Sequence, residues 1–153
     1  ELIENYDVDL KDLLNVRTFL DHNRVFEEPS ISTEHRVSNS TGAFAYRGKR
    51  ISNNTIEDSL LEHFQKWELY IKKFGLLVIE LHTVPPQITA KNLGATAATA
   101  YDATHGYSDQ YIVEVDVFNK IIKEAGLVVN KKLCRKFPDT DYATVTINLL
   151  QGK

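Results

Sequence analysis

The sequence contains no methionine, a single cysteine, and no apolar run long enough to cross a bilayer. With only Cys134, an intrachain disulfide framework is excluded, which is typical of proteins of the reducing cytoplasm. The formal net charge of −3 also leaves no basic excess that would attract nucleic acid or an anionic membrane. Because translation begins at methionine, a chain that starts at Glu1 and holds none predicts a fragment of a longer protein.

Several catalytic motifs are missing as well. The chain has no G-x-S-x-G nucleophile elbow, no P-loop and no G-x-G-x-x-G dinucleotide fingerprint. It also has no H-x-H, H-E-x-x-H or C-x-x-C pair, so residue spacing alone defines no metal site. The sequence therefore gives no support to a serine hydrolase, or to a nucleotide-binding enzyme built on these motifs.

What is present fits one α/β domain. The chain has 153 residues, of which 42% are hydrophobic and 25% charged, so residues 1–153 are predicted to form a single domain around one core. Residues 15–20 favour a short strand. The polar stretch 27–54 predicts a long connection or lid, with a hairpin at residues 47–49.

The middle of the chain gives the clearest pattern. A capping box from Thr55 to Asp58 and a stripe of apolar residues predict a helix that ends at Gly75. The run Leu76–His82 is almost continuously apolar, which is typical of a central strand covered on both faces. The Ala/Thr-rich residues 89–104 then favour a weakly amphipathic helix or an ordered lid.

The last third predicts one more helix and two strands. Ser108 or Asp109 is expected to cap a helix that runs to about Ala125. Residues 127–137 and 142–150 favour strands, and the short turn between them requires antiparallel pairing. The element order is therefore β-α-β-α-β-β, with parallel strands followed by an antiparallel edge pair.

Three polar clusters interrupt the apolar patterns and are the candidate site. They are Asp21-His22-Asn23-Arg24 after the first strand, the pair Glu80 and His82, and the segment Asp102–Gln110. Ligands of open α/β sheets bind beyond the carboxyl ends of the strands, where the first two clusters lie. Side chains two apart in a strand share a face, so Glu80 and His82 are expected to point the same way.

Each cluster also has a structural interpretation. Asp21 can be a turn residue with Arg24 as its ion-pair partner, and a helix cap explains Ser108 and Asp109. His82 is favoured as a functional residue because it stands at a strand end beside a carboxylate. Histidine, carboxylate and amide oxygen together suit a redox-capable or hard divalent ion.

Three strings of residues resemble a known family. They are Arg17-Thr-Phe-Leu-Asp-His-Asn-Arg24, Gly75-Leu-Leu-Val-Ile-Glu-Leu-His82 and Asp102-Ala-Thr-His-Gly-Tyr-Ser-Asp-Gln110. Together with the element order, they resemble the C-terminal half of class I S-adenosylmethionine-dependent methyltransferases. The resemblance is to the C-methyltransferase domains of polyketide synthases, of the mononuclear-iron type that builds the apratoxin starter unit, and covers about residues 10–150.

The resemblance implies an activity, a cofactor and partners. It implies a Rossmann-like sheet and transfer of a methyl group from S-adenosylmethionine to a malonyl or β-keto-type acyl unit on an acyl carrier protein. It further implies an iron or manganese ion held by His82 and Gln110, with Asp21, His22 and Arg24 at the substrate rim. The glycine-rich cofactor loop of the family is not in this sequence, so the N-terminal half of the same domain is expected to supply it.

Two alternatives stay open. A metal-independent methyltransferase would use Glu80 and His82 as a general-base dyad, and a chelator added to the complete protein would separate it from the metal-dependent reading. A non-catalytic docking domain would bind a partner through residues 27–54. Unchanged methyl transfer by a His82→Ala variant of the complete protein would support the docking-domain alternative.

Overall fold

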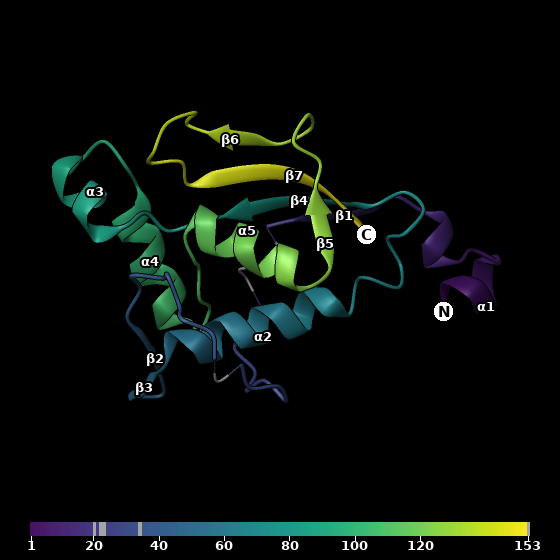
Figure 1. Cartoon of the computed structure of the whole chain (residues 1–153), viewed down its shortest axis with the longest axis horizontal. Coiled ribbons are helices and arrows are strands. Elements are labelled where there is room, and N and C mark those ends of the chain that lie inside the picture. The colour runs from purple at the N-terminus through teal and green to yellow at the C-terminus, as the bar shows by residue number, and fades with distance from the viewer. Residues whose placement is uncertain (20, 22–23, 34, 153) are drawn as a thin grey trace.

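The computed structural model describes residues 1–19, 21, 24–33 and 35–152 (Figure 1). Five helices, one 3-10 turn and seven strands are assigned in this part of the chain. They are α1 (Leu2–Tyr6), η1 (Leu10–Asp12), β1 (Asn15–Thr18), β2 (Phe44–Tyr46), β3 (Lys49–Ile51), α2 (Asn53–Gln65), β4 (Leu76–Leu81), α3 (Pro86–Lys91), α4 (Ala98–Tyr107), α5 (Val115–Glu124), β5 (Leu127–Val129), β6 (Arg135–Phe137) and β7 (Val145–Gly152).

The main sheet is mixed and has β4 near its centre. β1 pairs with β4 in parallel, and β7 pairs with β4 on its other side in the antiparallel direction. The order is β1-β4-β7-β5, and β6 also pairs antiparallel with β7. This confirms the α/β class and the parallel first pair. The predicted antiparallel pair of the last two strands is confirmed as well, since β6 pairs with β7. β7 lies inside the sheet, between β4 and the two short strands β5 and β6.

Helices α2 and α5 cover one face of this sheet and enclose the core (Figure 1). Phe64 of α2 meets Phe118 of α5 edge to face, with ring centroids 5.6 Å apart. Both rings are buried against Val78 of β4 and Leu150 of β7, which point to the same face of the sheet. In the part of the chain that the structure describes, no helix is long and apolar enough to span a membrane.

Helix α2 is shorter than its apolar stripe predicts. Ser52 caps it, since its Oγ accepts a hydrogen bond of 3.1 Å from the backbone N–H of Thr55. The capping box that begins at Thr55 is therefore wrong, and Asp58 instead binds the 27–54 segment. The helix ends at Gln65, and a series of turns carries the buried Ile71 back to the sheet.

The helix predicted from residue 108 begins later, at Val115. Residues 110–114 are extended because their backbone bridges two other segments: Gln110 pairs with Val25, and Glu114 pairs with Thr83. Long-range pairing thus overrides the local capping signal, and Ser108 follows α4 instead. The Ala/Thr-rich stretch forms two helices, α3 and α4, rather than one.

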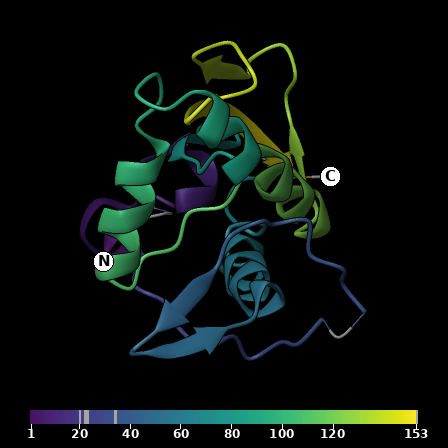
Figure 2. The ribbon, with the colours of Figure 1, turned by 90° about the vertical axis from the view of Figure 1, so that its left-hand side faces the viewer.

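The 27–54 segment is fixed to the helices by a buried ionic cluster. The Arg36 side chain is only 2% exposed, and its guanidinium lies 2.6 Å from Asp58 of α2 and 2.6 Å from Glu124 of α5. The predicted hairpin is confirmed, with β2 and β3 joined at Arg47 and Gly48. Figure 2 shows this segment passing around α2 and returning to it through the hairpin.

Candidate functional site

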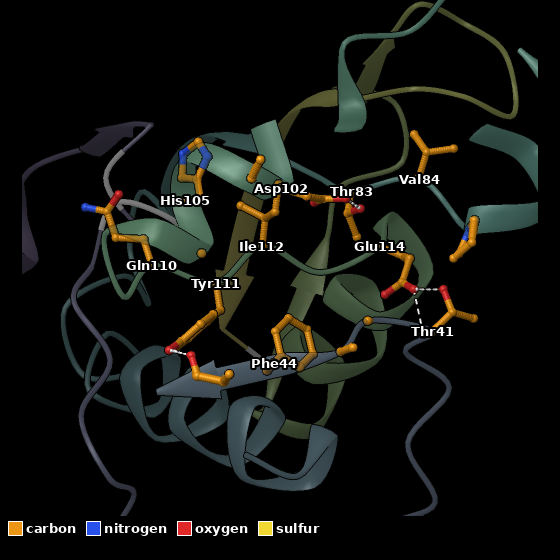
Figure 3. A pocket seen from close by; sticks show the side chains of 16 residues that line it. Thr41, Phe44, Thr83, Val84, Asp102, His105, Gln110, Tyr111, Ile112 and Glu114 are labelled. Atoms are coloured by element: carbon orange, nitrogen blue, oxygen red, sulfur yellow. Dashed lines mark hydrogen bonds between the residues drawn. The ribbon is translucent and has the colours of Figure 1, made fainter. Parts of the chain in front are cut away.

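A cavity of about 480 Å³ opens at the carboxyl end of β4 (Figure 3). Its walls come from α4, from residues 41–45 before and within β2, and from Thr83 and Val84 directly after β4. This is the position where ligands bind in open α/β sheets. Apolar walls with a few convergent polar groups are the usual composition of a small-molecule site.

Glu114 is the most unusual polar group of this cavity. Its residue is 6% exposed, and its Oε1 accepts hydrogen bonds from the backbone N–H and the hydroxyl of Thr41, at 2.7 and 2.6 Å (Figure 3). Its Oε2 has no hydrogen-bond partner among the described residues. The position suits an anion, since Glu114 precedes the first turn of α5. A buried carboxylate oxygen without a partner is costly, so it marks a place for a donor.

Asp102 of α4 faces the same cavity. Its Oδ2 accepts a hydrogen bond of 2.8 Å from the hydroxyl of Thr83, as Figure 3 shows. Partial burial of the carboxyl group raises the pKa of Asp102, and the charge of Glu114 raises it further, although the Thr83 bond opposes this. The two carboxyl groups therefore interact across the cavity.

The apolar wall is aromatic. Phe44 of β2 and Tyr111 meet edge to face with their ring centroids 5.6 Å apart. The Tyr111 hydroxyl donates to the carbonyl of Ala45 at 2.5 Å, which ties the extended 110–114 segment to the hairpin (Figure 3). His105 and Gln110 lie at the opposite end of the cavity from Glu114.

Asp21, predicted after β1, is the centre of a buried polar cluster. It is 3% exposed, and its Oδ1 lies 2.7 Å from both Arg17 Nε and His63 Nε2. Burial alone would raise the pKa of Asp21, but the hydrogen bond with His63 and the charge of Arg17 hold it below its ordinary value. His63 was not among the predicted site residues, because its only signal in the sequence is its place beside the apolar stripe of α2.

The other residues of the first cluster, Asp21–Arg24, do not all join Asp21 in the structure. Arg24 donates from Nη1 to Ser59 Oγ at 3.1 Å, rather than serving only as a partner of Asp21. Burial lowers the pKa of its guanidinium. His22, predicted at the substrate rim, lies outside the described residues, as does its neighbour Asn23.

Glu80 and His82 are both buried, at 3% and 0% exposure. Glu80 Oε1 accepts a hydrogen bond of 2.8 Å from the backbone N–H of Leu81. Glu80, His82 and Asp21 line one very small pocket. The structure therefore brings these three predicted residues together, while Gln110 lines the larger cavity.

The ring of His82 is hydrogen-bonded at both nitrogens. Its Nδ1 lies 3.2 Å from the carbonyl oxygen of Val113, which can only accept, so Nδ1 must carry the proton. Its Nε2 lies 2.7 Å from the hydroxyl of Thr146. Both ring nitrogens are thus engaged by the protein, and the described residues contain no group of three His, Cys, Asp or Glu side chains that could hold a metal. The iron or manganese site at His82 and Gln110 finds no support in this geometry, and we derive no step through a metal.

A second and larger hollow, of about 1100 Å³, lies between α5 and the strands β5 to β7. Its buried polar side chains already bind one another, since Asn148 Nδ2 donates to Thr146 Oγ1 at 2.8 Å. The cavity at the end of β4 differs because Glu114 still offers an acceptor there. We therefore place the candidate site in the cavity of Figure 3.

Comparison with known proteins agrees with this fold. A search of curated proteins finds no match. Residues 1–148 match the family described as the AprA MT2-like domain. The match covers nearly the whole chain, and the mixed sheet with its antiparallel last strands is compatible with a Rossmann-like methyltransferase fold. The chain therefore belongs to the AprA MT2-like family of methyltransferase domains, which use S-adenosylmethionine and serve in polyketide synthesis.

Proposed function

We propose that this chain forms the acceptor side of a C-methyltransferase. The substrate is a malonyl or β-keto-type acyl unit on an acyl carrier protein, and the methyl donor is S-adenosylmethionine. The observation that carries the proposal is the cavity at the carboxyl end of β4, where aromatic and aliphatic walls surround Asp102 and Glu114. Such a cavity can hold an acyl unit in a fixed orientation, away from bulk water.

Methyl transfer depends mainly on alignment. S-adenosylmethionine supplies a methyl group on a sulfonium centre when it is bound, and the acceptor carbon must approach it in line. In this chain Phe44 and Tyr111 form a rigid wall, because Tyr111 is fixed to the backbone of Ala45. The residues that line the cavity therefore orient the acceptor and limit its motion.

A carbon nucleophile also requires loss of a proton. The resemblance implies an iron or manganese ion for this step, but His82 and Gln110 line different cavities, which favours the metal-independent alternative. In that alternative one ring nitrogen of His82 must leave its hydrogen-bond partner, Val113 or Thr146, to take part in proton transfer. Glu80 and His82 remain the proposed dyad, with Asp21, His22 and Arg24 at the rim. Asp21 has its own imidazole partner in His63, which gives a second candidate pair for proton transfer.

We propose further that the N-terminal half of the same domain packs against the sheet and supplies the cofactor loop. Two features support this. β1 pairs only with β4 among the described strands, so its other edge is open to a further strand. The sheet face opposite α2 and α5 is apolar and incompletely covered: Leu77 and Ile79 are half-buried, and Val16 is 53% exposed.

The proposal is tested with the complete protein, labelled S-adenosylmethionine and malonyl-loaded carrier protein. Label is expected on the acyl carbon between the two carbonyl groups, located by NMR of the released acyl unit. We expect transfer to persist after treatment with a metal chelator; loss that iron or manganese restores would support the metal-dependent alternative instead. Binding of the carrier protein without any transfer would favour the docking-domain alternative.

A further inference from the structure

The unpaired oxygen of Glu114 limits what the cavity can bind. Thr41 provides two hydrogen-bond donors to Oε1 of Glu114. Oε2 has no donor among the described residues, and the residue is only 6% exposed, so water does not easily take that place. Asp102 adds a second carboxyl group, with Thr83 as its hydroxyl donor. Carboxylates have lone pairs for several donors. This end of the cavity therefore requires a ligand that brings hydrogen-bond donors.

The acyl unit itself cannot meet this requirement. A malonyl or β-keto thioester presents carbonyl and carboxylate oxygens, which are acceptors and which two carboxyl groups would repel. The donors of a carrier-linked substrate lie in the phosphopantetheine arm, whose amide groups carry N–H bonds. The chemistry of the substrate thus divides it into an acceptor-rich acyl end and a donor-bearing arm.

We infer that Glu114, assisted by Asp102, binds amide N–H groups of the phosphopantetheine arm and so orients the acyl unit. This inference rests on the proposed function, and it names the part of the substrate that this end of the cavity recognises. Val84 and Ile112 give the apolar lining that the methylene and methyl groups of the arm need. In this arrangement the arm lies along the wall near Glu114, and the acyl end points toward Gln110 and His105.

The first test compares two substrates in the complete protein. Malonyl-pantetheine carries the amide N–H groups, and malonyl methyl thioester does not. Wild-type protein is expected to prefer malonyl-pantetheine in kcat/KM, mainly through KM. Glu114→Gln keeps the acceptor for Thr41 but turns the second oxygen into a donor, so the preference should fall about tenfold or more. The matched control is Glu62→Gln, because Glu62 also receives hydrogen bonds from one hydroxyl residue, Ser30, at an exposed site away from the cavity.

The second test measures binding without turnover. Pantetheine is titrated into the complete protein and followed by NMR, beside an analogue whose amide nitrogens are methylated. Wild type should bind pantetheine about tenfold more tightly than the methylated analogue, and Glu114→Gln should remove that difference. Thermal unfolding verifies that the variant is folded.

The outcomes separate this inference from the proposed function. If methyl transfer occurs and Glu114→Gln leaves the substrate preference unchanged, the inference is overturned while the function stands. If no acyl substrate is methylated but the binding difference is found and depends on Glu114, the proposed function fails while recognition of the arm stands. Equal binding of pantetheine and its methylated analogue by wild type also overturns the inference.

Discussion

Replacement of Arg36 by methionine is expected to lower the free energy of unfolding by about 3–5 kcal/mol. The guanidinium is 2% exposed and forms ion pairs with Asp58 and Glu124, each at 2.6 Å, and with Glu57 at 3.7 Å. Methionine fills a similar volume but leaves the buried carboxylates of Asp58 and Glu57 without this cation. The loss is measured by urea denaturation at pH 7.

The chain contains a matched control for this substitution. Lys73 lies 2.6 Å from Asp12, the same distance as Arg36 from Asp58, but the Lys73 and Asp12 side chains are each 61% exposed. Lys73→Met should therefore cost no more than about 1 kcal/mol. If the two variants lose equal stability, burial is not what makes the Arg36 cluster strong, and the attachment of residues 27–54 needs another explanation.

Gly75→Ala should destabilise the fold by about 3 kcal/mol or more, which is the second large effect. Gly75 has φ +88°, a conformation that L side chains rarely adopt. A Cβ here would also lie 2.6 Å from the carbonyl oxygen of Leu150, in the strand that pairs with β4. The backbone would have to move where the sheet is held together, and a chemical denaturation curve would show the loss.

Gly126→Ala isolates the conformational part of this cost. Gly126 has φ +81°, yet a Cβ built there meets nothing within 4 Å. Its expected cost is therefore only about 1–2 kcal/mol, from the left-handed backbone alone. A loss at Gly126 as large as that at Gly75 would contradict the close approach of Gly75 to β7.

The central strand could be predicted from sequence because its signal is local. A continuous apolar run after a glycine identified β4 within one residue of its end. The place of β7 could not be predicted in this way, because strand order depends on contacts between distant segments. The predicted start of α5 was wrong for the same reason. Pairing of Gln110 with Val25 and of Glu114 with Thr83 keeps the residues before α5 extended.

The candidate site was predicted in part. Of the predicted clusters, the segment Asp102–Gln110 contributes residues to the candidate cavity. The carboxyl-end rule pointed to Asp21, Glu80 and His82, which the structure places around a separate, very small pocket. The larger cavity depends on the contact between Glu114 and Thr41, which are 73 positions apart in the chain. No local pattern encodes such a contact, so nothing in the sequence around Glu114 marked it as a site residue. Asp102 was predicted as a member of a polar cluster. Its hydrogen bond with Thr83 could not be predicted from the sequence, because it depends on how α4 packs against the end of β4.

The most direct test of the acceptor cavity is to fill it and measure methyl transfer to malonyl-loaded carrier protein. Ala103 lines the cavity from an exposed position of α4, whereas Ala100 is exposed on the same helix and does not line it. Ala103→Trp is expected to reduce kcat/KM by about a hundredfold, while Ala100→Trp stays near wild type. Undiminished transfer by a folded Ala103→Trp protein would contradict the assignment of this cavity as the acceptor site.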